Sequence, residues 1–105
     1  MLKKKERISR KKFNELFKNS KIISRGSFFM LRKHPDDVFT AAVVVPKKIA
    51  KKATERNHIK RLTYSLIAEK IKQQSGVVGS YIFIFQKKPI QIKDIQGDFE
   101  KITFV

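Results

Sequence analysis

An excess of positive charge is the feature that most constrains how this chain can fold. Lysine and arginine together number 25 and aspartate and glutamate nine, so the 105 residues carry a formal net charge of +16. Like charges in one small domain repel one another and destabilise the compact state, unless a polyanion neutralises them. We therefore expect a polyanionic partner, which is a nucleic acid, an anionic membrane or an acidic protein.

The apolar segments favour nucleic acid among these partners. The longest apolar runs, Ala41–Val45 and Tyr81–Phe85, have the length of strands and are too short to cross a bilayer. Binding to a membrane surface would require a strongly apolar helix face opposite the lysines. No apolar stretch follows the basic segment 1–12, so this segment is not a signal peptide. We expect a cytoplasmic protein with no membrane association.

The pattern of apolar residues predicts one α+β domain that spans residues 1–105. Hydrophobic residues make up 41% of the chain and include nine Phe, which is enough for a packed core. The turn signal at His34–Asp37 predicts an antiparallel hairpin of the strands on either side, and the long helix that follows allows a later strand to pair parallel with an earlier one. Periodicity predicts helices at 9–19, at 54–74 and within 90–105, and strands at 27–33 (to which 21–24 can add), 38–45 and 79–86.

The segment Lys47–Arg61 carries the strongest functional signal, because seven Lys and Arg residues stand there against one Glu. A basic helix sector of this kind suits RNA: Arg and Lys reach phosphates, Asn both donates and accepts hydrogen bonds, and Tyr stacks on bases. The alternative is a lysine-rich helix face that only contacts solvent. On a helical wheel the basic sector contains Arg56, Asn57, Lys60, Arg61 and Tyr64.

The same wheel predicts which residues of this helix face the core. Ile59, Leu62 and Leu66 form one sector, which we assign to the core. Ile67 and Ile71 fall within the basic sector, and the wheel gives no reason for two apolar side chains there.

Four segments together resemble the ribonuclease P protein component family: VVVPKKIAKKATERNHIKRL, RKKFNELFKNS, SFFMLRK and YIFIFQKKP. The first is similar to the family's signature, and the four extend over nearly the whole chain. The resemblance implies an αβββαβα fold with one central mixed sheet and helices packed on it, similar to a domain of a small-subunit ribosomal protein. It also implies a left-handed βαβ crossover, against the usual right-handed rule.

The resemblance implies a function as well. The family's protein subunit binds the catalytic RNA and the 5′ leader of precursor tRNA, and supports Mg²⁺-dependent endonucleolytic removal of that leader. Catalysis would belong to the RNA, and Mg²⁺ would be bound mainly by the RNA and not by the protein alone. We therefore expect a monomer, with one protein per RNA, that is inactive by itself.

The resemblance also implies two sets of site residues. Three positions depart from the family pattern: His58 replaces an Arg on the solvent sector, Leu31 stands where a Tyr is common, and Tyr64 replaces a basic residue. Whether Phe13 and Phe17 belong to the core or to the leader cleft stays open. The residues expected to bind the catalytic RNA are Lys47, Lys48, Lys51, Lys52, Arg56, Asn57, Lys60 and Arg61. Those expected to bind the leader, in a cleft between the first helix and the sheet, are Phe13, Phe17, Phe29, Leu31, Lys48, Lys60 and Tyr64.

Other functions fit the sequence less well. The main rival is a ribosomal or ribosome-associated RNA-binding protein of similar fold with no enzymatic role, and a DNA-binding module is weaker because the basic helix follows a strand. The chain has no cysteine, and its two histidines lie far apart without acidic neighbours at ligand spacing. A carboxylate nuclease site from Asp94, Asp98 and Glu100 is a remote alternative. We expect no catalytic residue and no metal ligand in the protein.

Overall fold

The elements follow one another in the order αβββαβα, as predicted. The structure is a computed structural model that describes residues 6–74 and 76–102. The first five residues of the basic N-terminal segment and the last three of the chain lie outside the described residues. Segment 21–24, predicted only as an addition to the next strand, belongs to a strand of its own. The elements are α1 (Arg10–Lys18), β1 (Lys21–Arg25), β2 (Phe29–His34), β3 (Phe39–Val44), α2 (Ala53–Gln73), β4 (Gly79–Phe85) and α3 (Ile92–Glu100).

The strands form one mixed sheet in the order β1-β2-β4-β3. β4 pairs antiparallel with β2 and parallel with β3, and β1 pairs antiparallel with the other side of β2. The predicted hairpin of β2 and β3 is therefore wrong, because β4 lies between them. The two strands do run in opposite directions, but they share no hydrogen bonds. The parallel pairing through α2 is confirmed, and the left hand of this crossover stays a prediction.

β4 takes the centre of the sheet because its side chains are apolar on both faces. Tyr81, Ile82 and Phe83 all have 0% exposed surface, although successive side chains of a strand point to opposite faces. At an edge, such a strand would leave apolar surface and backbone groups in water. β3 lies at the edge instead, where the backbone N–H of Ile8 donates to the carbonyl of Ala41 at 2.9 Å.

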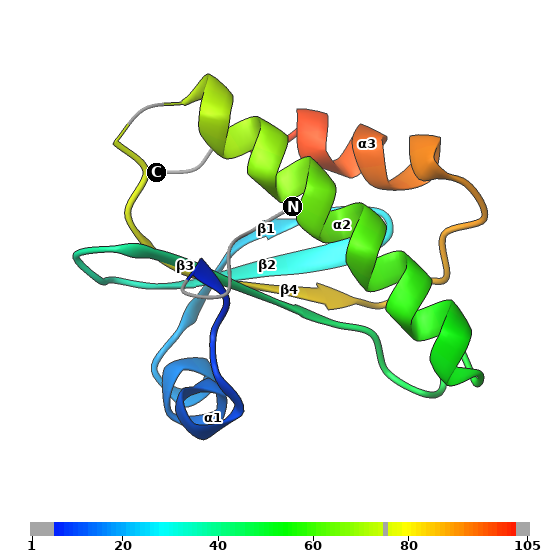
Figure 1. Cartoon of the computed structure of the whole chain (residues 1–105), viewed down its shortest axis with the longest axis horizontal. Coiled ribbons are helices and arrows are strands. Elements are labelled where there is room, and N and C mark those ends of the chain that lie inside the picture. Colours follow the sequence, from blue (N-terminus) through cyan, green and yellow to red (C-terminus); the bar gives the residue numbers. More distant parts are fainter. Residues whose placement is uncertain (1–5, 75, 103–105) are drawn as a thin grey trace.

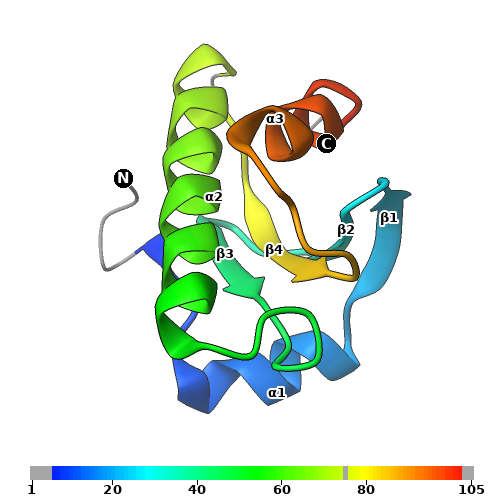
Figure 2. The same cartoon turned by 90° about the vertical axis from the view of Figure 1, so that its right-hand side faces the viewer.

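Helices lie on both sides of the sheet, with α2 and α3 on one side and α1 on the other (Figures 1 and 2). We call the side under α2 and α3 the core face, to which Phe29, Leu31 and Phe83 point. The opposite side is the α1 face, and it carries Arg32 and Ile82. The two faces offer different surfaces, because the core face is closed by two helices and the α1 face by one short helix.

An aromatic cluster fills the core face. The ring centroid of Phe29 lies 5.5 Å from that of Phe83, 5.4 Å from Phe85 and 5.2 Å from Phe99 of α3. Tilted rings at these separations add to the free energy that comes from burying their area. The cluster joins β2, β4 and α3, so the last helix is part of the core.

α2 presents a slightly different face to the core from the one predicted. Ile59, Thr63 and Ile67 are buried at i, i+4 and i+8, whereas Leu62 and Leu66 are only half-buried. The hydroxyl of Thr63 donates to the Ile59 carbonyl at 2.7 Å, so its burial leaves no unpaired donor. The core sector is therefore rotated toward the basic sector, which explains the apolar side chain of Ile67.

A buried carboxylate ties α3 to the turn between β1 and β2. Asp98 is 2% exposed and accepts hydrogen bonds from the backbone N–H groups of Ser27, Phe28 and Phe29 at 3.0, 2.7 and 3.0 Å. Gly26 allows this approach, because a Cβ at that position would lie 2.4 Å from a carboxylate oxygen. The carboxylate that the sequence left as a remote nuclease candidate therefore has a structural role.

We expect Asp98→Ala to lower the free energy of unfolding by about 2–4 kcal/mol, because it removes charge-assisted bonds and leaves a buried N–H unpaired. Glu100→Ala is the matched control: Glu100 is an exposed carboxylate of the same helix, and its loss should cost no more than about 0.5 kcal/mol. Urea unfolding of both variants makes the comparison. Equal stabilities of the two variants would contradict the role assigned to Asp98.

Candidate nucleic-acid interface

The basic connector between β3 and α2 is held in a defined turn. The backbone N–H groups of Ile49 and Ala50 both donate to the carbonyl of Pro46, at 3.0 and 3.3 Å. Ala50 is 1% exposed and anchors the connector in the core. With this anchor in place, the charged side chains project outward. The connector lysines, all exposed, are Lys47, Lys48, Lys51 and Lys52.

Arg56 fixes the connector to the first turn of α2. One guanidinium nitrogen, Nη1, donates to the carbonyls of Ala50 and Lys51 at 3.0 and 2.8 Å. Sequence reasoning assigned Arg56 to RNA only, and the structure adds a structural role for the same side chain. The residue is only half-buried, so part of it also reaches solvent.

The remaining residues of the basic sector reach solvent beyond Arg56. Asn57 and Arg61 are exposed and Lys60 is half-buried. His58, predicted to face solvent, is also exposed. These side chains continue the charged surface of the connector along the first two turns of the helix.

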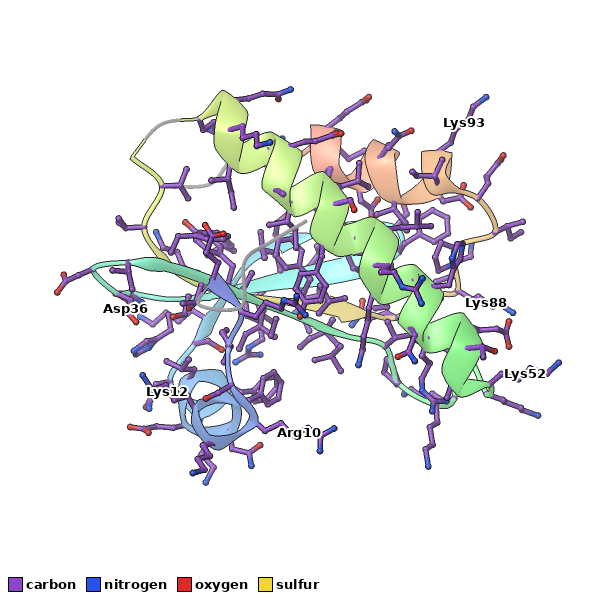
Figure 3. The ribbon with its side chains drawn as sticks, viewed as in Figure 1. Arg10, Lys12, Asp36, Lys52, Lys88 and Lys93 are labelled. Atoms are coloured by element: carbon purple, nitrogen blue, oxygen red, sulfur yellow. The ribbon has the colours of Figure 1, made fainter. Side chains whose placement is uncertain are left out.

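The segment that follows β4 contributes a further cation to this region. Lys88 forms a salt bridge with Glu55 in the first turn of α2, and this hydrogen bond lowers the pKa of the Glu55 carboxyl. Figure 3 shows Lys52 and Lys88 at the same end of the molecule. The first turn of α2 and the segment after the last strand, 33 residues apart in sequence, are thereby joined.

Two of the predicted leader-binding residues lie on the wrong side of the sheet. Phe29 and Leu31 are 1% and 0% exposed and belong to the core. Neither side chain is accessible to a bound strand, so both predictions are wrong. Because side chains alternate along a strand, an error of one residue changes the face. The residues of β2 that point to the α1 face are Met30, Arg32 and His34.

Aromatic side chains of α1 lie against that face. Phe13 and Phe17 are both half-buried, with ring centroids 5.9 Å apart. The guanidinium carbon of Arg32 lies 4.6 Å from the centroid of Phe17, and its Nε and Nη2 donate to Ser20. Phe13 and Phe17 therefore belong neither fully to the core nor fully to the surface, because each ring is partly covered. Sequence reasoning missed Arg32, although its place between the apolar Leu31 and the end of the strand indicated the opposite face.

A cavity with both polar and apolar walls lies on another flank of α1. Its lining includes Ser9, Lys12, Asp36, Thr40 and Ser80, but neither Phe13 nor Phe17. The hydroxyls of Thr40 and Ser80 are 2.8 Å apart. The cavity is thus distinct from the aromatic surface of α1. Figure 3 labels two cations of this helix, Arg10 and Lys12, and Lys12 belongs to the wall of the cavity.

Tyr64 lies one turn after Lys60, on the side of α2 that faces β3. Its hydroxyl accepts a hydrogen bond from the backbone N–H of Val43 at 3.2 Å. Burial raises the pKa of the Tyr64 hydroxyl. The hydrogen bond from Val43 and the charge of Arg7 lower this pKa, but by less than burial raises it. The residue is half-buried, so only part of its ring is available to a ligand.

The acidic residues offer no site for a metal ion in the described part of the chain. Residues 6–74 and 76–102 contain no group of three or more His, Cys, Asp or Glu side chains that could hold one. Asp94 accepts hydrogen bonds from the backbone N–H groups of Ile90 and Gln91, and Asp98 is occupied as described above. Within the same ranges, no helix is both long and apolar enough to cross a membrane.

Comparison with known proteins gives the family. The Ribonuclease P profile matches residues 2–103. The ribonuclease P protein component of Parasynechococcus marenigrum (strain WH8102) is 28% identical over 54 residues, which are 51% of this chain and 42% of that protein. The chain thus covers less than half the length of this curated relative.

Solved structures agree with the profile. A Staphylococcus aureus RNase P protein, a mutant with defective mRNA degradation activity, matches with a TM-score of 0.70 at 25% identity, over 92% of this chain and 84% of the other. The RNase P protein of Thermotoga maritima matches with a TM-score of 0.58 at 26% identity, over 94% and 84%. With the fold, the basic connector and the profile match in agreement, the chain belongs to the Ribonuclease P protein family.

Proposed function

We propose that this chain is the protein subunit of ribonuclease P, and that it binds a catalytic RNA through the basic connector and the first turns of α2. The observation that carries the proposal is that this member of the family holds several exposed cations in fixed positions. Exposed lysines stand on a connector that Arg56 and Pro46 hold in one shape. A fixed array of cations matches a folded RNA backbone at a smaller entropy cost than a mobile tail.

The protein's contribution to the reaction is binding and not chemistry. In the proposed complex Mg²⁺ would be held mainly by the RNA, and its chemistry there would be to activate water and to neutralise charge at the scissile phosphate. Asp94 and Asp98 accept backbone hydrogen bonds in the protein, and neither has a part in the proposed reaction. The chain's own residues neutralise phosphates and orient the substrate.

The single-stranded 5′ leader of precursor tRNA would contact the α1 face. Phe13 and Phe17 offer ring surface, and Arg32 lies over one of the rings. Stacking on aromatic and guanidinium planes tolerates any base, which suits leaders of varied sequence. Lys48 and Lys60 remain candidates for the leader's phosphates, and Arg32 replaces the buried Phe29 and Leu31 in this proposal.

We expect the protein alone to leave precursor tRNA intact, and the protein with the cognate RNA to lower the Mg²⁺ concentration needed for cleavage. The reason is that its cations supply part of the charge neutralisation that Mg²⁺ otherwise provides. Cleavage is measured as leader release over a Mg²⁺ titration. Hydrolysis by an RNA-free preparation would contradict the proposal that the RNA is the catalyst. If the protein does not stimulate cleavage by the RNA, a ribosomal RNA-binding role is favoured instead.

We expect Lys60→Glu combined with Arg61→Glu to weaken binding of the catalytic RNA and to reduce its salt dependence. If both side chains contact phosphates, the slope of log K against log salt should fall by about 1.4–1.8. Lys72→Glu combined with Lys93→Glu changes the net charge equally, at exposed positions late in α2 and on α3. If the two double variants behave alike, only net charge matters and the proposed face is wrong.

We expect Phe17→Ala to weaken binding of precursor tRNA, by roughly 1–3 kcal/mol per stacked base, and to spare mature tRNA. Phe29→Ala is the matched control in the core, where removing a Phe should cost about 3–5 kcal/mol of stability and impair every activity together. Binding is measured against leader length, with thermal unfolding of each variant. A large stability loss in Phe17→Ala without leader dependence would remove Phe17 from the site.

A further inference from the structure

The N-terminal segment runs along the free edge of β3. Arg7 and Ala41 form a parallel bridge, and the backbone N–H of Ile8 donates to the Ala41 carbonyl at 2.9 Å. In Figure 1 this segment, in dark blue, lies beside β3. The backbone of Arg7 is thus fixed to the sheet, although its side chain is exposed.

Tyr64 fixes the side chain of the same arginine. The guanidinium carbon of Arg7 lies over the Tyr64 ring, 5.5 Å from its centroid. The ring is itself anchored, because its hydroxyl accepts the N–H of Val43 on the same strand edge. A cation over an aromatic face is attracted by the ring's quadrupole. Strand pairing and ring contact together restrict where this cation can point.

The anchored cation lies at the end of the basic sector of α2. Asn57, Lys60, Arg61 and Tyr64 are spaced at i, i+3, i+4 and i+7, which places them on one stripe of the helix. Arg7 contacts the last of them, Tyr64, from 57 residues earlier in the sequence. The stripe of polar and charged side chains therefore continues from the helix onto the edge of the sheet.

We propose that Arg7 is an RNA phosphate contact, and that Tyr64 is the positioning residue that holds it in line with Asn57, Lys60 and Arg61. The inference deepens the proposed function and rests on RNA binding by that sector. A guanidinium forms paired hydrogen bonds with phosphate oxygens. Holding it over a ring before binding reduces the side-chain entropy that is lost in the complex. Tyr64 thereby acts through Arg7 and not as a base-stacking surface.

The test is a double-mutant cycle on RNA affinity and salt slope in the full chain, with the cognate ribonuclease P RNA as the probe. Arg7→Ala should weaken binding roughly five- to ten-fold and lower the log–log salt slope by about 0.7–0.9. Tyr64→Leu should weaken it about two- to five-fold in the wild-type background, and have no effect once Arg7 is Ala. Tyr64→Phe keeps the ring but loses the bond from Val43 that anchors it, so its RNA affinity should lie between those of the wild type and Tyr64→Leu.

Two further variants make the test specific. Arg25→Ala removes an exposed arginine from β1, at the opposite edge of the sheet, and should change affinity much less than Arg7→Ala. Adding Tyr64→Arg to Arg7→Ala moves the cation onto the helix and should restore both affinity and salt slope. Thermal unfolding of each variant separates a loss of fold from a loss of contact.

The outcomes distinguish this inference from the function on which it rests. If Arg7→Ala matches Arg25→Ala, or if Tyr64→Leu acts equally with and without Arg7, the inference is overturned. In that case the Lys60→Glu, Arg61→Glu variant can still bind poorly, and the RNA-binding face of α2 stands. If that variant also binds like its charge-matched control, the proposed function fails with the inference.

Discussion

The insertion of β4 between β2 and β3 is the constraint on which the rest of the structure depends. Its backbone is hydrogen-bonded on both sides, and its side chains are buried on both faces. Because Phe83 and Phe85 face one side of the strand and Ile82 the other, each side needs its own helical cover. α2 and α3 cover one face of the sheet and α1 covers the other. The burial of β4 on both faces therefore explains why the fold has three layers.

This arrangement brings the charged and the aromatic surfaces into one structure without placing them in the core. β3 ends at Val44 beside β4, and the connector that follows must turn outward to reach α2 on the core face. Its lysines are therefore exposed, while α1 presents Phe13 and Phe17 on the other face. Charges spread over separate surfaces repel one another less than a single cluster would, and each surface is open to a polyanion.

Several polar groups that suggest chemistry in the sequence stabilise the fold instead. Asp98 accepts three backbone N–H groups of the β1–β2 turn, and Arg56 donates to two connector carbonyls. Tyr64 accepts a bond from the edge of β3. In each case a side chain satisfies backbone groups that loops and edges leave without partners. The proposed RNA surface is consequently rigid, since the groups that shape it are tied to the sheet.

The sequence by itself determined the order of the elements apart from β1, together with the basic connector, because periodicity and charge are local properties. Tertiary structure alone decided the strand order, since an apolar run pairs equally well with either neighbour. It also decided that Phe29 and Leu31 face the core while Arg32 faces α1, because register fixes the face of every residue on a strand. The contact of Arg7 with Tyr64 joins distant segments, and no local pattern encodes it.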